Sequence, residues 1–275
     1  MIGAIFGGLA ALLIGLTDVF GRQVALKTTA ITASSTMQGF GAVSVLLSLI
    51  LWPGSFSFSS LALGALSGAG FALGLSSYYW GLNRESAAVV APLTAILSAL
   101  LPFAWVAFRG VSISGLTTLG VTLALAGLVA VTTPGAGTRP NRAGIRLGLL
   151  AGLGYGFGQA LLLEVATASG PVAIAGQRVA AFAIMIPVAI QAREKVVAPA
   201  STRWWGIAAG ICAGGSSVAL FQGLRFDPVP ALIGISLFPI FSVAVGRIRY
   251  QDTLTKRQLL GITCAVAGTI AVVAG

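Results

Sequence analysis

The chain has 275 residues, of which 57% are hydrophobic and 8% are charged, and its formal net charge is +10. Soluble domains carry about 25% charged residues, so the charged side chains here are too few to cover a water-facing surface. The composition therefore excludes a soluble globular domain, a disordered chain and a disulfide scaffold, and it predicts a polytopic membrane protein.

Ten apolar stretches follow one another along the chain. A spanning helix needs about 20 mainly apolar residues, and breaks at charges, Pro and Gly clusters separate candidate spans at residues 2–21, 31–52, 59–82, 86–108, 112–133, 144–165, 170–192, 203–224, 229–249 and 256–274. The first stretch lacks a basic leader and a small-residue cleavage site, so it is predicted to be a retained span. We expect an all-α membrane protein with ten transmembrane helices.

The two halves of the chain resemble each other. Residues 119–131 match residues 260–272 at an offset of 141. The stretch near Gly64 matches the one near Gly206 at an offset of 142, and the stretch near Gly7 matches the one near Gly148 at an offset of 141. This pattern predicts a five-helix repeat at 1–133, a connecting loop at 134–143 and a second five-helix repeat at 144–275. Because five is odd, the second repeat must be inverted in the membrane, as in many secondary transporters.

Basic residues predict the orientation of the spans. One set of connections holds thirteen of them, and the opposite set holds only Arg109 and Arg225; the thirteen are Arg22, Lys27, Arg84, Arg139, Arg142, Arg146, Arg193, Lys195, Arg203, Arg247, Arg249, Lys256 and Arg257. Since Lys and Arg favour the cytoplasmic face, both termini are expected on the extracytoplasmic side. No run of Lys and Arg follows a helix face, so nucleic acid is not an expected partner.

Several stretches resemble the drug/metabolite transporter superfamily, and within it the ten-helix EamA-type exporters. They are Leu237–Gly261, Ala265–Gly268, Tyr79–Leu82, Val90–Leu93 and Leu119-Gly120. The resemblance implies export of small metabolites across the cell (inner or plasma) membrane. Many relatives keep both termini in the cytoplasm, so the resemblance and the charge count disagree about orientation.

Arg178 is the clearest candidate for solute binding, because it lies well inside a predicted span and a charge there costs about 2.5–3.5 kcal/mol. It needs an acid, carbonyls or a solute anion as its partner. A structural pair with Glu164 is one reading, an anionic solute is a second, and snorkelling to the lipid interface is a third. Further substrate-binding candidates are Gln177, Gln38, Tyr79, Trp80, Tyr155, Gln159 and Gln222. For the aromatic residues the alternative is anchoring at the membrane interface.

Asp18 and Glu164 are the candidates for proton coupling, because a buried carboxylate can take up and release a proton. The alternative for Asp18 is an i,i+4 salt bridge with Arg22. Pro92, Pro102 and Pro239 lie inside predicted spans and are hinge candidates, because proline frees a carbonyl and kinks a helix. Gly-xxx-Gly motifs in spans 59–82 and 203–224 predict that these two spans pack closely.

The expected function is secondary active transport of small organic solutes, amino-acid-like or other small metabolites, by alternating access and most readily outward. Protons are favoured over Na⁺ as the coupling ion, because few acids lie within the spans. The alternative is a membrane-embedded enzyme acting on lipid or sugar-phosphate groups. The chain has no His and no paired acids or phosphate-binding loop, so we expect no enzyme activity, cofactor or metal. The expected partners are a small-molecule substrate and the lipid bilayer, with the protein a monomer or homodimer.

Overall fold

The computed structural model describes every residue except 85–86, 133–141, 239, 242–243 and 245–254, and the described part is almost wholly helical. Its helices are α1 Ile2–Ala25, α2 Ala30–Leu51, α3 Phe58–Arg84, α4 Ala87–Phe108, α5 Gly115–Thr132, α6 Arg142–Leu162, the short η1 Thr167–Ser169, α7 Gly170–Gln191, α8 Ala200–Phe226, α9 Pro228–Ser236 and α11 Lys256–Ala274. For nine of the ten predicted spans, the helix ends lie within a few residues of the prediction.

Seven helical segments in the described residues are long and apolar enough to cross a membrane, and two shorter apolar segments lie at Leu93–Phe108 and Gly115–Val131. Large apolar side chains on the outside of the bundle, such as Leu51 and Phe108, are more than four-fifths exposed. Because exposed apolar surface on this scale is unfavourable in water, the outer face is suited to lipid.

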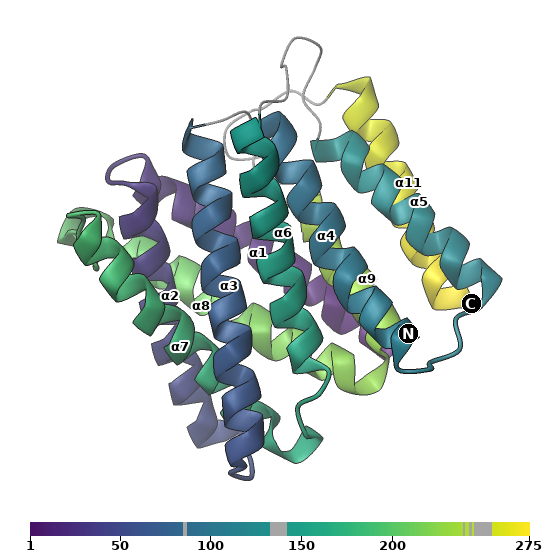
Figure 1. The fold of residues 1–275 in the computed structure, drawn as a ribbon, viewed down its shortest axis with the longest axis horizontal. Coiled ribbons are helices and arrows are strands. Elements are labelled where there is room, and N and C mark those ends of the chain that lie inside the picture. Colours follow the sequence, from purple (N-terminus) through teal and green to yellow (C-terminus); the bar gives the residue numbers. More distant parts are fainter. Residues whose placement is uncertain (85–86, 133–141, 239, 242–243, 245–254) are drawn as a thin grey trace.

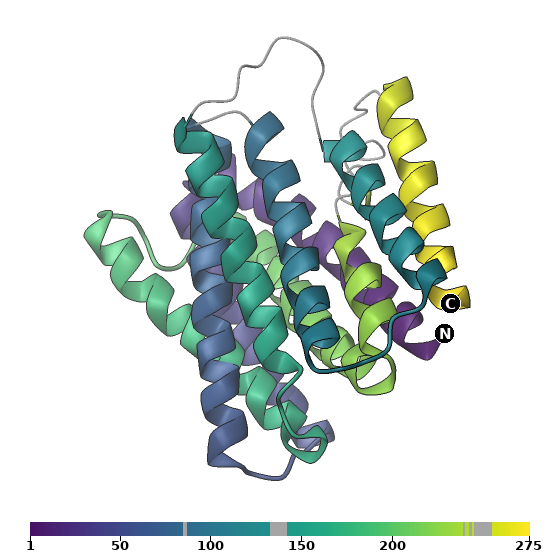
Figure 2. The same ribbon diagram turned by 45° about the vertical axis from the view of Figure 1, so that its right-hand side comes forward.

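The helices pack in pairs that have counterparts when the two halves are exchanged (Figures 1 and 2). Helix α1 packs on α8 and α9, as α6 packs on α3 and α4; α2 packs on α8, as α7 packs on α3. Helices α2 and α7 contact each other, and so do α5 and α11, which lie side by side at one edge of the bundle. Both halves therefore contribute to every major interface.

Glycines set how closely these helices approach. A Cβ atom added at Gly70 of α3 would lie 2.7 Å from the carbonyl oxygen of Gly154 in α6, and one at Gly210 of α8 would lie 2.7 Å from the backbone nitrogen of Gly41 in α2. Only glycine permits such backbone contacts. The expected close packing of α3 on α8 is wrong, because α3 uses its glycines against α6 and α7, and α8 uses its own against α2.

Helix α9 is shorter than predicted. The predicted span 229–249 is interrupted: α9 ends at Ser236, and the N–H of Leu237 turns back to the carbonyl of Gly234 at 3.2 Å. Beyond this turn Phe238, Ile240, Phe241 and Ala244 are again helical. The hydroxyl of Ser236 donates to the carbonyl of Ile233 at 2.7 Å. Pro239 follows and has no N–H to donate to the preceding turn, so the sequence cannot continue a regular hydrogen-bond ladder here.

Both termini lie near each other (Figures 1 and 2). The C-terminal Gly275 lies against the start of α5, where a Cβ atom added to it would be 3.0 Å from the backbone nitrogen of Thr117. The connection from α4 to α5 turns at Gly110, whose φ of 79° is in the left-handed region that favours glycine. The termini and this connection therefore lie at the same end of the bundle.

Candidate functional site

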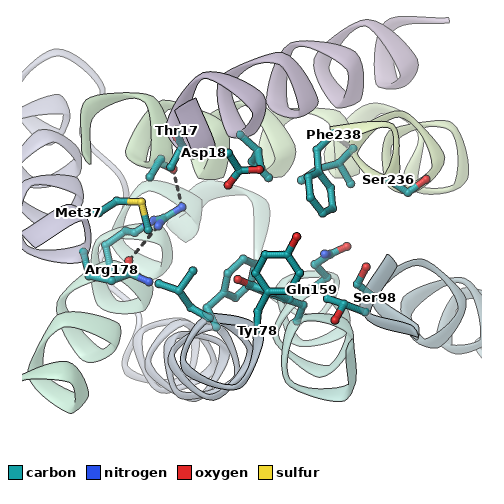
Figure 3. A pocket seen from close by; sticks show the side chains of 17 residues that line it. Thr17, Asp18, Met37, Tyr78, Ser98, Gln159, Arg178, Ser236 and Phe238 are labelled. Carbon is teal, nitrogen blue, oxygen red and sulfur yellow. Dashed lines mark hydrogen bonds between the residues drawn. The ribbon is translucent and has the colours of Figure 1, made fainter. Parts of the chain in front are cut away.

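A central cavity of about 80 Å³ opens between the two halves of the chain (Figure 3). One water needs about 10–15 Å³ by the same measure, so the cavity has room for several waters or a small organic solute. It is lined by Ile14, Thr17, Asp18, Met37, Gln38, Phe71, Leu75, Tyr78, Thr94, Ser98, Tyr155, Gln159, Arg178, Ala213, Ile235, Ser236 and Phe238. These residues come from α1, α2, α3, α4, α6, α7, α8 and α9, with Phe238 just beyond the end of α9.

The lining residues include pairs that occupy equivalent positions in the two sequence repeats. At the offset of 141, Asp18 corresponds to Gln159 and Met37 corresponds to Arg178, and both members of each pair line the cavity. The other such pairs are Ile14 with Tyr155 and Thr94 with Ile235, and at the offset of 142 Phe71 with Ala213. The cavity therefore lies where equivalent positions of the two halves meet, although the side chains at those positions differ.

Arg178 lies on α7, is only 6% exposed and is held by neutral acceptors. Its Nη1 donates to Gln38 Oε1 at 3.0 Å, its Nε donates to Ser217 Oγ at 3.0 Å, and its Nη2 donates to Ser217 Oγ at 2.6 Å and to the carbonyl of Ala213. A guanidinium has five N–H groups, so one N–H of Nη1 has no acceptor among the described residues.

A second row of hydrogen bonds fixes the position of Ser217. Its hydroxyl donates to Gln177 Oε1 at 2.8 Å, and Gln177 Nε2 donates to Ser67 Oγ at 2.8 Å. Ser67 in turn donates to the carbonyl of Gly158 at 2.6 Å. The chain of bonds joins α6, α3, α7 and α8, so the guanidinium is held by both halves of the protein.

The reading that pairs Arg178 with Glu164 is wrong. Glu164 follows the end of α6, accepts from Trp105 Nε1 at 2.8 Å and lies 3.5 Å from Nη2 of Arg109. Its side chain is 27% exposed and that of Arg109 is 60% exposed, so this is a surface ion pair of small energetic value. Glu164 does not line the central cavity, so among the described lining residues Asp18 is the acid.

Asp18 lies on α1 and points into the cavity, with Arg178 to one side of it and Gln159 to the other in Figure 3. Two tyrosines, Tyr78 and Tyr155, also line the cavity. Tyr155 is held edge-on against Phe71, with ring centres 5.6 Å apart and an angle of 77° between the rings. The described lining residues thus combine one cation, one carboxylate and several aromatic rings with many apolar side chains.

Gln159 on α6 has a feature that the other buried amides lack. Its side chain is 7% exposed, and its Oε1 atom is buried with no hydrogen-bond partner in the described structure. Buried polar groups in proteins nearly always have a partner. This oxygen is therefore an unused acceptor at the wall of the cavity.

The remaining predicted site residues lie elsewhere. Trp80 is 44% exposed, and Gln222 accepts from Arg225 Nη1 at 3.2 Å and lines a separate groove between α1, α2 and α8. The side chain of Tyr79 lies outside the described part of the chain. Gln177 does not line the cavity but holds Ser217, as described above. The predicted link between Gln222 and the site is wrong, because the side chain faces a different hollow.

The hinge candidates have different outcomes. Pro102 is buried within α4, a helix described as continuous from Ala87 to Phe108. The side chain of Pro92 and all of Pro239 lie outside the described residues. The break at the end of α9 lies beside the cavity, because Ser236 and Phe238 both line it.

Sequence reasoning missed the small hydroxyl residues that complete the site. Ser217 and Ser67 hold the guanidinium and its supporting amide, and Thr17, Ser98 and Ser236 line the cavity. Ser and Thr are common in membrane helices for packing reasons, so no local pattern marked these five. The repeat offset is a signal that could have found some of the lining residues, because a position equivalent to a lining residue often lines the cavity too. Thr94 is equivalent to Ile235 and Asp18 to Gln159, and all four line it.

Comparison with known proteins supports this description. A crystal structure of another protein has the same fold, with a TM-score of 0.80, 15% sequence identity, and coverage of 98% of this chain and 95% of that chain. No curated protein matches the chain. The EamA-like transporter family matches residues 142–274, which correspond to the predicted second repeat. The chain is therefore a multi-pass membrane protein, helical throughout most of its described residues, whose residues 142–274 match the EamA-like transporter family.

Proposed function

We propose that this protein is a secondary active transporter that exports small organic solutes, amino-acid-like or other small metabolites, across the cell membrane. The observation that carries the proposal is the central cavity, which is lined by equivalent positions from both halves. A site at the meeting point of two repeats is the place where transporters of this architecture bind their solutes. One copy of the chain supplies the whole site, so a monomer suffices.

Alternating access requires the halves to be inverted repeats that rock about the bound solute. Two observations support this arrangement: the odd number of spans in each predicted half, and helix packing that is unchanged when the halves are exchanged. The same helices that form the cavity, such as α1 with α8 and α6 with α3, form the packed interfaces. Motion of one half against the other would therefore change access to the cavity directly.

Arg178 is proposed to bind an anionic group of the solute. The guanidinium carries a full charge, its described acceptors are neutral, and one N–H remains available. A charge inside the membrane is costly without a partner, and a carboxylate of the solute would supply one. The planar donor arrangement of arginine suits a carboxylate or phosphate.

Asp18 is proposed to couple transport to protons. It is the carboxylate that lines the cavity in the described structure, whereas Glu164 lies in a surface ion pair. A carboxylate inside a membrane protein commonly marks a proton pathway. Binding of a proton to Asp18 would remove the negative charge of its carboxylate from the solute site. The affinity of the site for the solute would then differ between the two sides of the membrane.

Flux measurements in proteoliposomes test the proposal. Liposomes preloaded with unlabelled L-leucine should take up labelled L-leucine by counterflow, and Arg178→Gln should reduce the rate by about 30-fold or more, because removing one partner of a buried charge pair costs about 2 kcal/mol or more. Arg225→Gln is the matched control, since Arg225 bonds Gln222 outside the central cavity. Equal loss in both variants would contradict a binding role for Arg178.

The enzyme alternative makes a different prediction in the same preparation. Incubation of purified protein with phospholipid and sugar-phosphate substrates should give no product, while labelled solute enters the liposomes. Product formation without solute flux would overturn the transporter proposal.

A further inference from the structure

We infer that the cavity selects anionic solutes that also carry an N–H or O–H hydrogen-bond donor, and that Gln159 accepts the hydrogen bond from this donor. This inference rests on the proposed function, because it concerns the solute of the same site. It starts from the buried Oε1 atom of Gln159, which has no partner in the described structure. A buried acceptor without a donor is unfavourable, so its retention in the wall of a cavity points to a ligand that satisfies it.

The Ser and Thr hydroxyl groups around the cavity do not supply that donor. Thr94 donates its hydroxyl to the carbonyl of Val90 at 2.8 Å, and Ser98 donates to that of Ala95 at 3.1 Å. Thr17 donates to the carbonyl of Leu13 at 2.9 Å, and Ser236 donates to that of Ile233 at 2.7 Å. Each hydroxyl has a single proton, so these four residues offer only acceptor capacity to a solute.

The cavity is therefore polarised. Arg178 presents N–H donors and a positive charge, with Asp18 and Gln159 to its side in Figure 3. The Oε1 atom of Gln159, the carboxylate of Asp18 and the four Ser and Thr hydroxyl oxygens are acceptors in the same lining. A solute that fits this pattern places an anionic group at Arg178 and a donor group at Gln159. Asp18 occupies the equivalent repeat position to Gln159, and its carboxylate favours a donor that is positively charged.

Contrast with Gln177 shows why Gln159 is unusual. Gln177 is 1% exposed and uses both ends of its amide, accepting from Ser217 and donating to Ser67, each at 2.8 Å. Gln177 thus has a structural role that is complete without a ligand. A site that is built to bond an N–H or O–H of its ligand strongly rejects an analogue that lacks the group, because its own polar atom is then left unpaired.

Four probes of similar shape separate the requirements for the solute. L-Leucine has a carboxylate and an ammonium group, 2-hydroxy-4-methylpentanoate has a carboxylate and a hydroxyl, 4-methylpentanoate has the carboxylate alone, and 3-methylbutylamine has the amine alone. Binding to purified full-length protein is measured by the shift of the unfolding temperature with probe concentration. We expect the two donor-bearing acids to bind about tenfold or more tightly than 4-methylpentanoate.

Gln159→Met should remove this preference, because methionine keeps the size of the side chain and lacks the acceptor. The ratio of affinities for the donor-bearing and donor-free acids should fall to about one, while Gln159→Glu, which keeps an acceptor, should retain it. An equal weakening of all acids by Gln159→Met would overturn the inference. A third outcome separates this inference from the proposed function. If Arg178→Gln loses binding of the carboxylate probes but the wild type shows no preference for the donor-bearing acids, the proposed function stands and the role of Gln159 is rejected.

The stability of the protein without added solute gives an independent test. Gln159→Met should unfold at the same temperature as the wild type or higher, because it removes an unpaired buried acceptor. The matched control Gln177→Met should lower the unfolding temperature by several degrees, because it leaves the buried Ser217 hydroxyl without its acceptor and removes the N–H that Ser67 accepts. If both variants lose stability equally, Gln159 is structural and the inference is wrong. If none of the four probes binds, the proposed function fails for this class of solute, and the stability comparison still decides whether Gln159 has a structural role.

Discussion

At the scale of single residues, the site depends on one arginine that is buried without a carboxylate among its bonded partners. Neutral oxygens from Gln38, Ser217 and Ala213 hold the guanidinium in place but do not neutralise it. A positive charge is therefore maintained beside a cavity inside the membrane. Asp18 lies in the wall of the same cavity, so the charge there changes whenever this carboxylate takes up or releases a proton.

This arrangement predicts that Asp18→Asn uncouples transport from protons. Asparagine cannot take up or release a proton, so the ratio of solute flux with and without an imposed pH gradient should fall to about one. The flux ratio is measured in proteoliposomes at equal solute concentrations. Glu164→Gln should keep the wild-type ratio, because Glu164 pairs with Arg109 away from the cavity. A gradient-dependent flux in Asp18→Asn would show that another group carries the proton.

At the scale of helices, close backbone contacts at glycine define the interfaces between the halves. In α1, Gly7 packs directly on the backbone of Ala231 in α9, with an added Cβ atom 3.0 Å from the Ala231 Cα. The neighbouring Gly8 has nothing within 4 Å of the same position. Two adjacent glycines of one helix thus have opposite environments, and only one of them is required by packing.

Gly7→Ala should therefore destabilise the protein, and Gly8→Ala should not. Inserting a methyl group into a packed contact costs about 1–3 kcal/mol, whereas alanine at an open helix position is neutral or favourable by up to about 1 kcal/mol. The unfolding temperature of the two purified variants in detergent checks this prediction. Equal stability of Gly7→Ala and Gly8→Ala would mean that α1 and α9 do not pack as described.

At the scale of the whole molecule, the termini and the connection between α4 and α5 lie at one end of the bundle. That connection carries Arg109, and the connection between α8 and α9 begins after Arg225. Apart from Arg178, the other thirteen Lys and Arg residues lie in the opposite set of connections or at the helix ends beside them. The positive-inside rule thus predicts that the end with the termini faces the extracytoplasmic side.

We expect a reporter fused after Gly275 to be active only when the reporter functions outside the cytoplasm. The matched fusion within the connection between α7 and α8, at Lys195, should give the reverse result, because that connection carries the basic residues of the cytoplasmic set. Activity of a cytoplasm-dependent reporter at Gly275 would establish the opposite orientation, which is common among the EamA-type relatives that the chain resembles.

The sequence by itself determined the positions of the helices and predicted a duplication. Apolar length and charge placement depend only on composition along the chain, because every backbone polar group in a bilayer must be bonded within the segment. This is why the ends of α1 to α8 and α11 agree with the predicted spans. The same reasoning identified Arg178, Asp18, Gln38, Tyr155 and Gln159, since polar groups within a membrane span are rare enough to be noticed.

Only the tertiary structure decided which of these side chains meet. Glu164 pairs with Arg109 rather than Arg178, and Gln222 faces a groove apart from the cavity. Helices that are apolar on all sides give no sequence signal for the face that turns inward, so such pairings depend on the rotation of each helix in the bundle. The sequence also could not predict that Oε1 of Gln159 lacks a donor, because the hydrogen bonds of a buried amide depend on atoms from helices that are distant in the sequence.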